Sequence, residues 1–301
     1  MTVLHVPAKW HLSPKQVLSN YLAICKIKVV LMLVLTAWIG IALAPDMQRG
    51  WVSQVMSLLG IGFLSAAAAA INHIVDREID KKMARTRHRP IASAQLSITN
   101  ALLFALILSI LGCALLIIWS NLLCTILTLG ALVGYAVIYT LFLKRATPQN
   151  IVIGGLAGAM PPLLGWVSET GTLSAPPWLL VMIIFTWTPP HFWALAIARK
   201  NDYQRANIPM LPVTHGVAFT KLCIIAYSVL LGIVCLLPYL IGMSGWVYLS
   251  SACLLNAVFI SKSINLYWHQ SEQQAMALFR FSISYLLILF IALFIDQWLL
   301  Q

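Results

Sequence analysis

The sequence predicts an all-α, polytopic membrane protein with about nine transmembrane helices. Of its 301 residues, 61% are hydrophobic and 9% are charged, and the mean hydropathy is +0.90. A soluble domain of this size has no interior large enough to hide so much apolar surface. The apolar residues also come in separate runs of about 20 residues, the length that crosses a hydrocarbon core as a helix.

The apolar runs give the predicted spans in chain order, and one of them is short. They extend from Ile24 to Ala44, Val52 to Ile71, Ala101 to Trp119, Leu122 to Leu143, Ile151 to Val167, Trp178 to Ala198, Leu222 to Ile241, Trp246 to Ile260 and Phe281 to Leu300. Residues 24–301 are therefore expected to form one transmembrane domain, and residues 1–23 a cytoplasmic N-terminal segment. That segment has neither the pattern of a signal peptide nor that of a mitochondrial presequence, so we expect a bacterial inner membrane.

The basic residues predict the topology. With the N-terminus placed inside, eighteen of the nineteen Lys and Arg residues fall on the inner side, and only Arg49 falls outside. This distribution follows the positive-inside rule. The net charge of +11 is therefore a topology signal and a source of phosphate contacts, and it does not indicate nucleic-acid binding. The longest polar loops, residues 72–100 and 199–220, also fall inside, so we expect the active site on the cytoplasmic face.

A ladder of oxygen-bearing side chains follows the second apolar run. Asn72, Asp76 and Asp80 are spaced by four residues, which places them on one face of a helix over two turns. Mg²⁺ takes one or two carboxylates from a protein and completes its shell with water and phosphate oxygens. The ladder therefore predicts a metal site that holds the diphosphate of a lipid substrate at the water boundary.

The basic neighbours of the ladder leave an alternative open. In that reading the segment is an ordinary solvated helix end whose acids pair with Arg77, Lys81 and Lys82. Composition favours the metal site, because the chain has only eight acidic residues and three of them fall within positions 76–80. Arginine binds phosphate oxygens in a fork and lysine adds a point charge. The candidates for contact with the diphosphate are Arg77, Arg85, Arg89, Tyr139, Lys144 and Lys200.

Two further candidates lie toward the second long inner loop. Asp202 is a lone carboxylate among basic residues, which fits either an ion pair or a metal ligand. His191 follows Pro189 and Pro190 inside an apolar run. An ionisable side chain at that depth indicates a functional site, although a hydrogen-bonded packing residue is the alternative.

Taken together, these segments resemble the UbiA superfamily of intramembrane aromatic prenyltransferases, and within it the branch that farnesylates protohaem IX. The resemblance runs from about Lys26 to Val213. It rests on the Asn72/Asp76/Asp80 ladder, the Arg-Thr-x-x-Arg-Pro run of residues 85–90, Tyr139-Thr140, Leu143-Lys144-Arg145, the Gly- and Pro-rich segment 150–166, the Thr-Pro-Pro-His-Phe-Trp run of residues 188–193, and Asp202-Tyr203. The ladder is typical of the superfamily, and the runs at 85–90 and 188–193 are typical of the haem branch.

The resemblance implies a nine-helix bundle around a central cavity, with Mg²⁺ and farnesyl diphosphate bound by two acidic motifs. It implies transfer of farnesyl to a vinyl group of protohaem with addition of water, so that haem O and diphosphate form. His191 and Trp193 would then serve the haem, and haem A synthase or terminal oxidase assembly would be partners. One position departs from the superfamily, because Ala198 stands where the second motif commonly has another aspartate, which leaves Asp202 alone.

Two other functions stay open on the sequence. A prenyltransferase of the same fold that acts on a quinone precursor or on chlorophyll differs only in its acceptor. A transporter of an anionic solute would also explain basic inner loops, but it is expected to have paired interrupted helices near the midplane. This chain instead concentrates its polar residues at one face.

Overall fold

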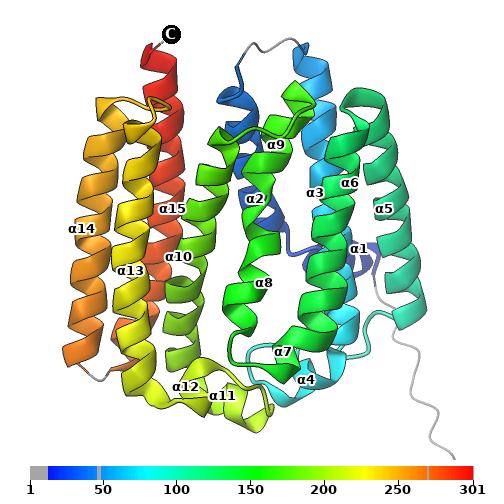
Figure 1. Ribbon diagram of the computed structural model, residues 1–301. Coiled ribbons are helices and arrows are strands. Elements are labelled where there is room, and N and C mark those ends of the chain that lie inside the picture. Colours follow the sequence, from blue (N-terminus) through cyan, green and yellow to red (C-terminus); the bar gives the residue numbers. More distant parts are fainter. Residues whose placement is uncertain (1–12, 46–48, 270, 301) are drawn as a thin grey trace, which may run out of the picture.

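Helices make up all the regular structure in the part of the chain that the structure describes, residues 13–45, 49–269 and 271–300. In this computed structural model, eight helical segments are long and apolar enough to cross a membrane. The bent pair α1 (Pro14–Ile24) and α2 (Ile27–Ala42) brings the number of described spans up to nine. Figure 1 shows the long helices standing side by side. The prediction of an all-α, multi-pass membrane protein is therefore confirmed.

The remaining spans follow the predicted order. They are α3 (Trp51–Val75), α5 (Ile98–Trp119), the run of α6 (Leu122–Val133), η1 (Gly134–Leu143) and α7 (Lys144–Ala146), the pair α8 (Asn150–Ala159) and α9 (Pro161–Thr170), α10 (Pro176–Ala198), α13 (Gly216–Leu240), α14 (Trp246–Trp268) and α15 (Glu272–Leu300). Three short helices, α4 (Arg77–Lys82), α11 (Lys200–Arg205) and α12 (Leu211–Thr214), lie in the loops of residues 72–100 and 199–220, which we call the inner loops after their predicted side.

The start of the bundle differs from the prediction. Ser13 and Gln16 form a capping box that begins α1, inside the segment expected to precede the domain. Lys26 then adopts φ 51°, in the left-handed region, and α2 leaves α1 at 51°. The apolar run predicted from Ile24 to Ala44 is therefore broken at Lys26, and its long helix extends from Ile27 to Ala42. Residues 1–12 of the expected N-terminal segment lie outside the described residues.

Close helix packing in the centre depends on glycine, as expected for small residues in membrane helices. A Cβ atom at Gly165 on α9 would lie 1.8 Å from the backbone oxygen of Ala37 on α2. A Cβ atom at Gly40 on α2 would lie 2.0 Å from the backbone oxygen of Pro162 on α9. The backbones of these two helices therefore touch, which is possible only without side chains at these positions.

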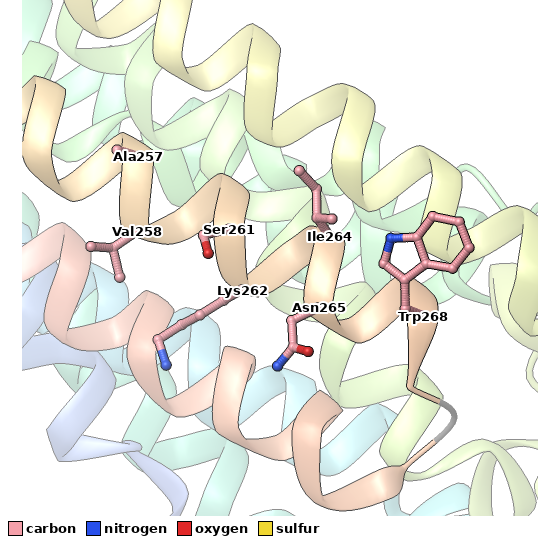
Figure 2. Close-up of a pocket in the computed structure, with 7 residues that line it drawn as sticks. All are labelled: Ala257, Val258, Ser261, Lys262, Ile264, Asn265 and Trp268. Atoms are coloured by element: carbon pink, nitrogen blue, oxygen red, sulfur yellow. The ribbon is translucent and has the colours of Figure 1, made fainter.

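The sequence predicts a short span from Trp246 to Ile260, and its predicted inner end is wrong, because α14 continues to Trp268. The apolar run stops at Lys262, but the helix does not, since the Lys262 ammonium lies 5.3 Å from the centre of the Phe281 ring on α15. A cation over an aromatic face is favourable and lets the helix continue. Figure 2 shows this stretch, where Lys262 and Asn265 line an open groove of about 750 Å³.

The polar elements gather at one end of the bundle. Figure 1 shows α4, α7, α11 and α12 together at the end opposite the C-terminus. The helices that frame them pack in a continuous series, in which α3 contacts α5 and α2, α2 contacts α9, and α10 contacts α8, α13 and α15. The two inner loops also share one hydrophobic cluster, which contains Ile79 and Met83 from the first and Tyr203 and Ile208 from the second.

The buried acids at the opposite end have structural partners. Asp296 on α15 accepts hydrogen bonds from the backbone N–H groups of Gly245, Val247 and Tyr248, and so caps α14. Glu169 accepts the backbone N–H of Arg49 at 2.8 Å. Both of these carboxylates hold helix ends, so among the described residues the buried acids left for chemistry lie at the other end of the bundle.

Candidate active site

The ladder forms as its spacing predicts. The backbone N–H of Asp76 donates to the oxygen of Asn72 at 2.9 Å, and that of Asp80 to the oxygen of Asp76 at 2.8 Å. The helical hydrogen bonds therefore continue from α3 into α4, and the three side chains stack over two turns. Asp76 is 1% and Asp80 3% exposed. Carboxylates so deeply buried require charged or hydrogen-bonding partners.

Each ladder residue is held by a cation from a different part of the chain. Lys144 Nζ lies 2.6 Å from Asp76 Oδ2, and Arg89 Nη1 lies 3.0 and 2.9 Å from the two Asp80 oxygens. Lys26 Nζ donates to Asn72 Oδ1 at 2.7 Å. Positive charge thus surrounds the ladder.

The alternative partners belong to another acid. Lys81 Nζ donates to Glu78 at 2.9 Å, and Arg77 Nε lies 3.6 Å from the same carboxylate. The hydrogen bond from Lys81 lowers the pKa of the exposed Glu78 carboxyl. The reading in which the ladder acids pair with these neighbours is therefore wrong. Arg77 Nη1 also donates to the Ile74 oxygen, and its predicted contact with a diphosphate stays a prediction.

A π-helical segment supplies the wall opposite the ladder. The segment η1 carries Tyr135, Tyr139 and Thr140, and Lys144 follows it directly. Thr140 Oγ1 accepts a hydrogen bond from Asn72 Nδ2 at 3.2 Å. The widened turn of a π-helix occurs frequently at functional sites, where it turns side chains that an α-helix would direct elsewhere. Here it brings two predicted residues, Tyr139 and Lys144, to the same end of the bundle.

Tyr139 has little freedom to move. Its ring stacks on that of Tyr135, with centroids 5.6 Å apart, and its other side lies against α8. A Cβ atom at Gly154 would lie 2.1 Å from Tyr139 Cδ2. Gly154 is therefore needed for Tyr139 to occupy this position.

The second inner loop lies within electrostatic range of the first. Burial raises the pKa of the Tyr203 phenol, and the charges of Arg85 and Arg89 act in the opposite direction. The guanidinium groups of the 85–90 run therefore lie close to the loop that carries Asp202 and Lys200. Asp202 is buried and Lys200 half-buried, and Arg85 is exposed.

The donor set fits a magnesium ion bound through few protein ligands. Asp76 Oδ1 is buried and has no hydrogen-bond partner among the described residues. No three His, Cys, Asp or Glu side chains of the described ranges lie close enough to hold one ion. An oxygen that faces no protein donor, beside an amide and a second carboxylate, suits a cation that takes its remaining ligands from water and phosphate.

His191 and Trp193 point to different helices. The His191 ring lies between Trp187, at a centroid distance of 4.3 Å, and Phe279 on α15, at 4.6 Å. Its Nδ1 atom lies 2.6 Å from Ser282 Oγ. Trp193 instead meets Tyr227 on α13 edge-on. The two residues predicted to serve haem therefore do not share a face of α10, and their roles stay predictions.

Sequence reasoning missed two contributors to the site. Lys26 reads in the sequence as topological charge at the edge of a span, and Tyr135 as one of many aromatic residues. The structure joins them, because Lys26 Nζ bonds both Asn72 and the Tyr135 hydroxyl, the latter at 3.3 Å. The only sequence signal for Lys26 is its place at the inner end of the first span, level with the ladder.

Comparison with known proteins gives the family of the chain. The profile of the UbiA prenyltransferase family matches residues 33–294. The chain belongs to this family. It is 70% identical over 283 residues to "Protoheme IX farnesyltransferase 2" of Pseudoalteromonas translucida, which covers 94% of this chain and 92% of that protein. It is 61% identical over 283 residues to "Protoheme IX farnesyltransferase" of Psychromonas ingrahamii, with 94% and 91% covered.

Solved structures of the UbiA family share the fold. A digeranylgeranylglyceryl phosphate synthase superposes with a TM-score of 0.77 at 20% identity, covering 94% of this chain and 99% of that one. A UbiA homologue from Archaeoglobus fulgidus bound to GPP and Mg²⁺ gives a TM-score of 0.63 at 15% identity, covering 91% and 99%. As a UbiA prenyltransferase the chain is an enzyme, so the transporter alternative is wrong.

Proposed function

We propose that this UbiA prenyltransferase transfers the farnesyl group of farnesyl diphosphate to a vinyl group of protohaem IX, with addition of water, to give haem O and diphosphate. The observation that carries this proposal is the 70% identity, over 94% of the chain, to a protein named for that activity. The buried carboxylate ladder and its surrounding cations suit the diphosphate of the donor. A quinone precursor is the competing acceptor.

The donor is assigned to the ladder. Asn72, Asp76 and Asp80 would hold Mg²⁺, which supplies positive charge to the diphosphate as it leaves. Lys144 and Arg89, which bind Asp76 and Asp80 here, are within reach of phosphate oxygens once the metal charge neutralises the carboxylates. Asp202, with Ala198 in place of a second acid, contributes one carboxylate at most. Arg77, Arg85, Tyr139 and Lys200 stand around this end as further candidate contacts.

The reaction needs the diphosphate charge to be stabilised and water to be kept from the allylic cation. The bond between farnesyl C1 and the diphosphate oxygen breaks, and the electron pair leaves with the oxygen. The vinyl group attacks C1 and leaves positive charge on the carbon attached to the porphyrin, where water adds and loses a proton. The buried ladder and the aromatic wall of Tyr135 and Tyr139 favour the first step by fixed charge in a water-poor site.

We assign the acceptor to the face of α10 that carries His191. The imidazole would either bind the haem iron or orient the attacking water. Since the basic inner loops follow the positive-inside rule, we place the ladder end on the cytoplasmic side of a bacterial inner membrane. Haem A synthase or the terminal oxidase assembly would consume the product.

The product decides the function. Membranes containing the protein should convert protohaem and farnesyl diphosphate, in the presence of Mg²⁺, to a haem heavier by one farnesyl group and one water, read by mass spectrometry. Membranes from cells lacking the protein serve as the control. If haem O does not depend on the protein while prenylation of a quinone precursor does, the haem assignment is wrong and the family assignment stands.

A further inference from the structure

A second polar site lies beside the ladder. A pocket of about 340 Å³ opens between α1, the inner end of α3 and the loop after α4. We call it the basic pocket, and its polar lining residues are Asn20, Lys26, His73, His88, Arg89 and Gln95. No carboxylate is among these described residues, so the pocket offers positive charge and hydrogen-bond donors to a ligand. That chemistry selects an anion.

Two buried side chains in this pocket call for a ligand. His73 is 3% exposed, and neither of its ring nitrogens has a hydrogen-bond partner among the described residues. The amide nitrogen of Asn20, which is 8% exposed, also has no described partner. Buried polar groups are nearly always hydrogen-bonded, because leaving one unsatisfied costs its desolvation free energy. Both side chains line the pocket, so an oxygen atom bound there would satisfy them.

The basic pocket is distinct from the metal site but shares a wall with it. His73 follows Asn72 in α3, and one helical step turns it about 100° away from the ladder face. Lys26 and Arg89 line the pocket and also hold Asn72 and Asp80. None of the three ladder residues lines the pocket. A metal-bound diphosphate needs those carboxylates, so the pocket suits an anion that is bound without metal.

We propose that the basic pocket binds the propionate carboxylates of the porphyrin acceptor, an assignment that rests on the proposed function. Its volume is at the lower end for ligand pockets, which suits an acidic arm of the acceptor while the apolar ring lies outside it. The two propionates of protohaem share one edge of the macrocycle, and the two vinyl groups lie on the pyrroles of the other edge. Anchoring the carboxylates fixes the rotation of the ring in its own plane and so turns the vinyl-bearing edge, and not the acidic edge, away from the pocket toward the apolar interior.

A chemical double-mutant cycle tests this assignment. The acceptors are protohaem and its dimethyl ester, in which the carboxylates are blocked, and the proteins are wild type and His73→Ala, with farnesyl diphosphate and Mg²⁺ saturating. We expect the KM for protohaem to rise about tenfold or more in His73→Ala, the range for a lost hydrogen bond to a charged group. In the wild type, the dimethyl ester should have a KM raised by a similar factor relative to protohaem. In His73→Ala, the ester and protohaem should have nearly the same KM, because esterification and the substitution remove the same contact.

Companion variants separate binding from folding. His73→Gln keeps a donor and should recover much of the affinity for protohaem, and His269→Ala, an exposed histidine after α14, should behave as wild type. His73→Ala should raise the KM for protohaem and leave the KM for farnesyl diphosphate unchanged, a split that loss of stability alone would not produce.

The outcomes distinguish the two proposals. If the effects of the ester and of the variant on KM are additive, the pocket assignment is overturned and the proposed function stands. If the variant instead raises the KM for farnesyl diphosphate and not that for protohaem, the pocket binds phosphate, and the proposed function again stands. A wild type that makes no product from protohaem overturns the proposed function and the pocket assignment with it.

Discussion

The Nδ1 atom of His191 lies 2.6 Å from the hydroxyl oxygen of Ser282, across the contact between α10 and α15. The Ser282 hydroxyl donates its one proton to the backbone oxygen of Phe279 at 2.7 Å. With that proton engaged, the oxygen is free to accept from the Nδ1–H tautomer of His191, in which the lone pair of the imidazole lies on Nε2. Histidines that bind a metal through one nitrogen almost always donate through the other in this way.

Ser282→Ala should therefore weaken the reaction with protohaem without altering the donor site. Residues that orient a metal-binding histidine typically contribute about 10–100-fold in affinity or activity. We expect a loss in this range in kcat/KM for protohaem, with the KM for farnesyl diphosphate unchanged. Steady-state kinetics with each substrate varied in turn measure both.

Ser228→Ala is the matched control, because Ser228 is buried between helices and bonds Ser263 at 3.0 Å, with no contact to His191. Equal losses in the two serine variants would show that the effect is one of packing, and the orientation of His191 would then play no part in the reaction.

The sequence predicts the spans and the ladder because both depend on local periodicity. Apolar run length locates the membrane helices, and four-residue spacing is enough to stack Asn72, Asp76 and Asp80. Helix ends were less predictable. The inner end of α14 passes Lys262, since its charge is accommodated by Phe281, a residue that sequence distance does not connect to it.

The partners of the ladder could not be predicted, because they are chosen by tertiary position. Arg77 and Lys81 are near in sequence, but Arg89 and Lys144 are the residues that reach the carboxylates. The left-handed turn at Lys26 brings its own ammonium to Asn72, and the π-helical turns before Lys144 bring that lysine to Asp76. The left-handed turn falls on a lysine, without the glycine that usually marks such a position.

Charge on the ladder should be required for turnover. Asp76→Asn and Asp80→Asn keep the side-chain shape but remove the charge that Mg²⁺ needs, so each should lower kcat by about a hundredfold or more. Asp202→Asn should have a smaller effect, since Ala198 leaves it without a paired acid. Rates are measured at limiting Mg²⁺.

Glu78→Gln provides the control for the same change on the same helix, because Glu78 is exposed and pairs only with surface cations. Its activity should match wild type. Near-normal turnover in Asp76→Asn or Asp80→Asn would exclude the ladder as the metal site.

Removing one partner of the Lys144–Asp76 ion pair should destabilise the protein more than removing both partners. The Lys144 and Asp76 side chains are 14% and 2% exposed, so Lys144→Met leaves a buried carboxylate without its cation. The expected cost is about 3–5 kcal/mol. The double variant Lys144→Met/Asp76→Asn should regain most of that stability but remain inactive. Thermal unfolding in detergent measures the stability of the wild type and of both variants.

Mg²⁺ gives this comparison a second readout. A cation that binds Asp76 replaces the lost charge, so Mg²⁺ should raise the Tm of Lys144→Met more than that of the wild type. A single variant as stable as wild type, or a Tm indifferent to Mg²⁺, would show that Asp76 does not need a cation.

Two glycines on α8 make a matched pair. Gly154→Ala forces a Cβ atom into the Tyr139 ring, whereas at Gly158 nothing described lies within 4 Å of an added Cβ. We expect Gly154→Ala to cost about 1–3 kcal/mol and to reduce activity through displacement of Tyr139. Gly158→Ala should be neutral or stabilising by up to about 1 kcal/mol, since alanine favours helix. Similar behaviour of the two variants would argue that Tyr139 is free to move.

The orientation of the ladder end can be tested with single cysteines. Ser168 belongs to a predicted outer loop but is buried, with Oγ donating to the Gly165 oxygen at 2.7 Å, so it cannot report topology. Thr172 at the same end is exposed, and Ser93 is exposed at the ladder end. In a background with Cys113, Cys223 and Cys253 replaced, an impermeant thiol reagent applied to whole cells should label Thr172→Cys and spare Ser93→Cys. Both should react in permeabilised cells, which shows that each position is reachable. Labelling of Ser93→Cys alone in intact cells would invert the topology and place the ladder, with its diphosphate, outside the cytoplasm.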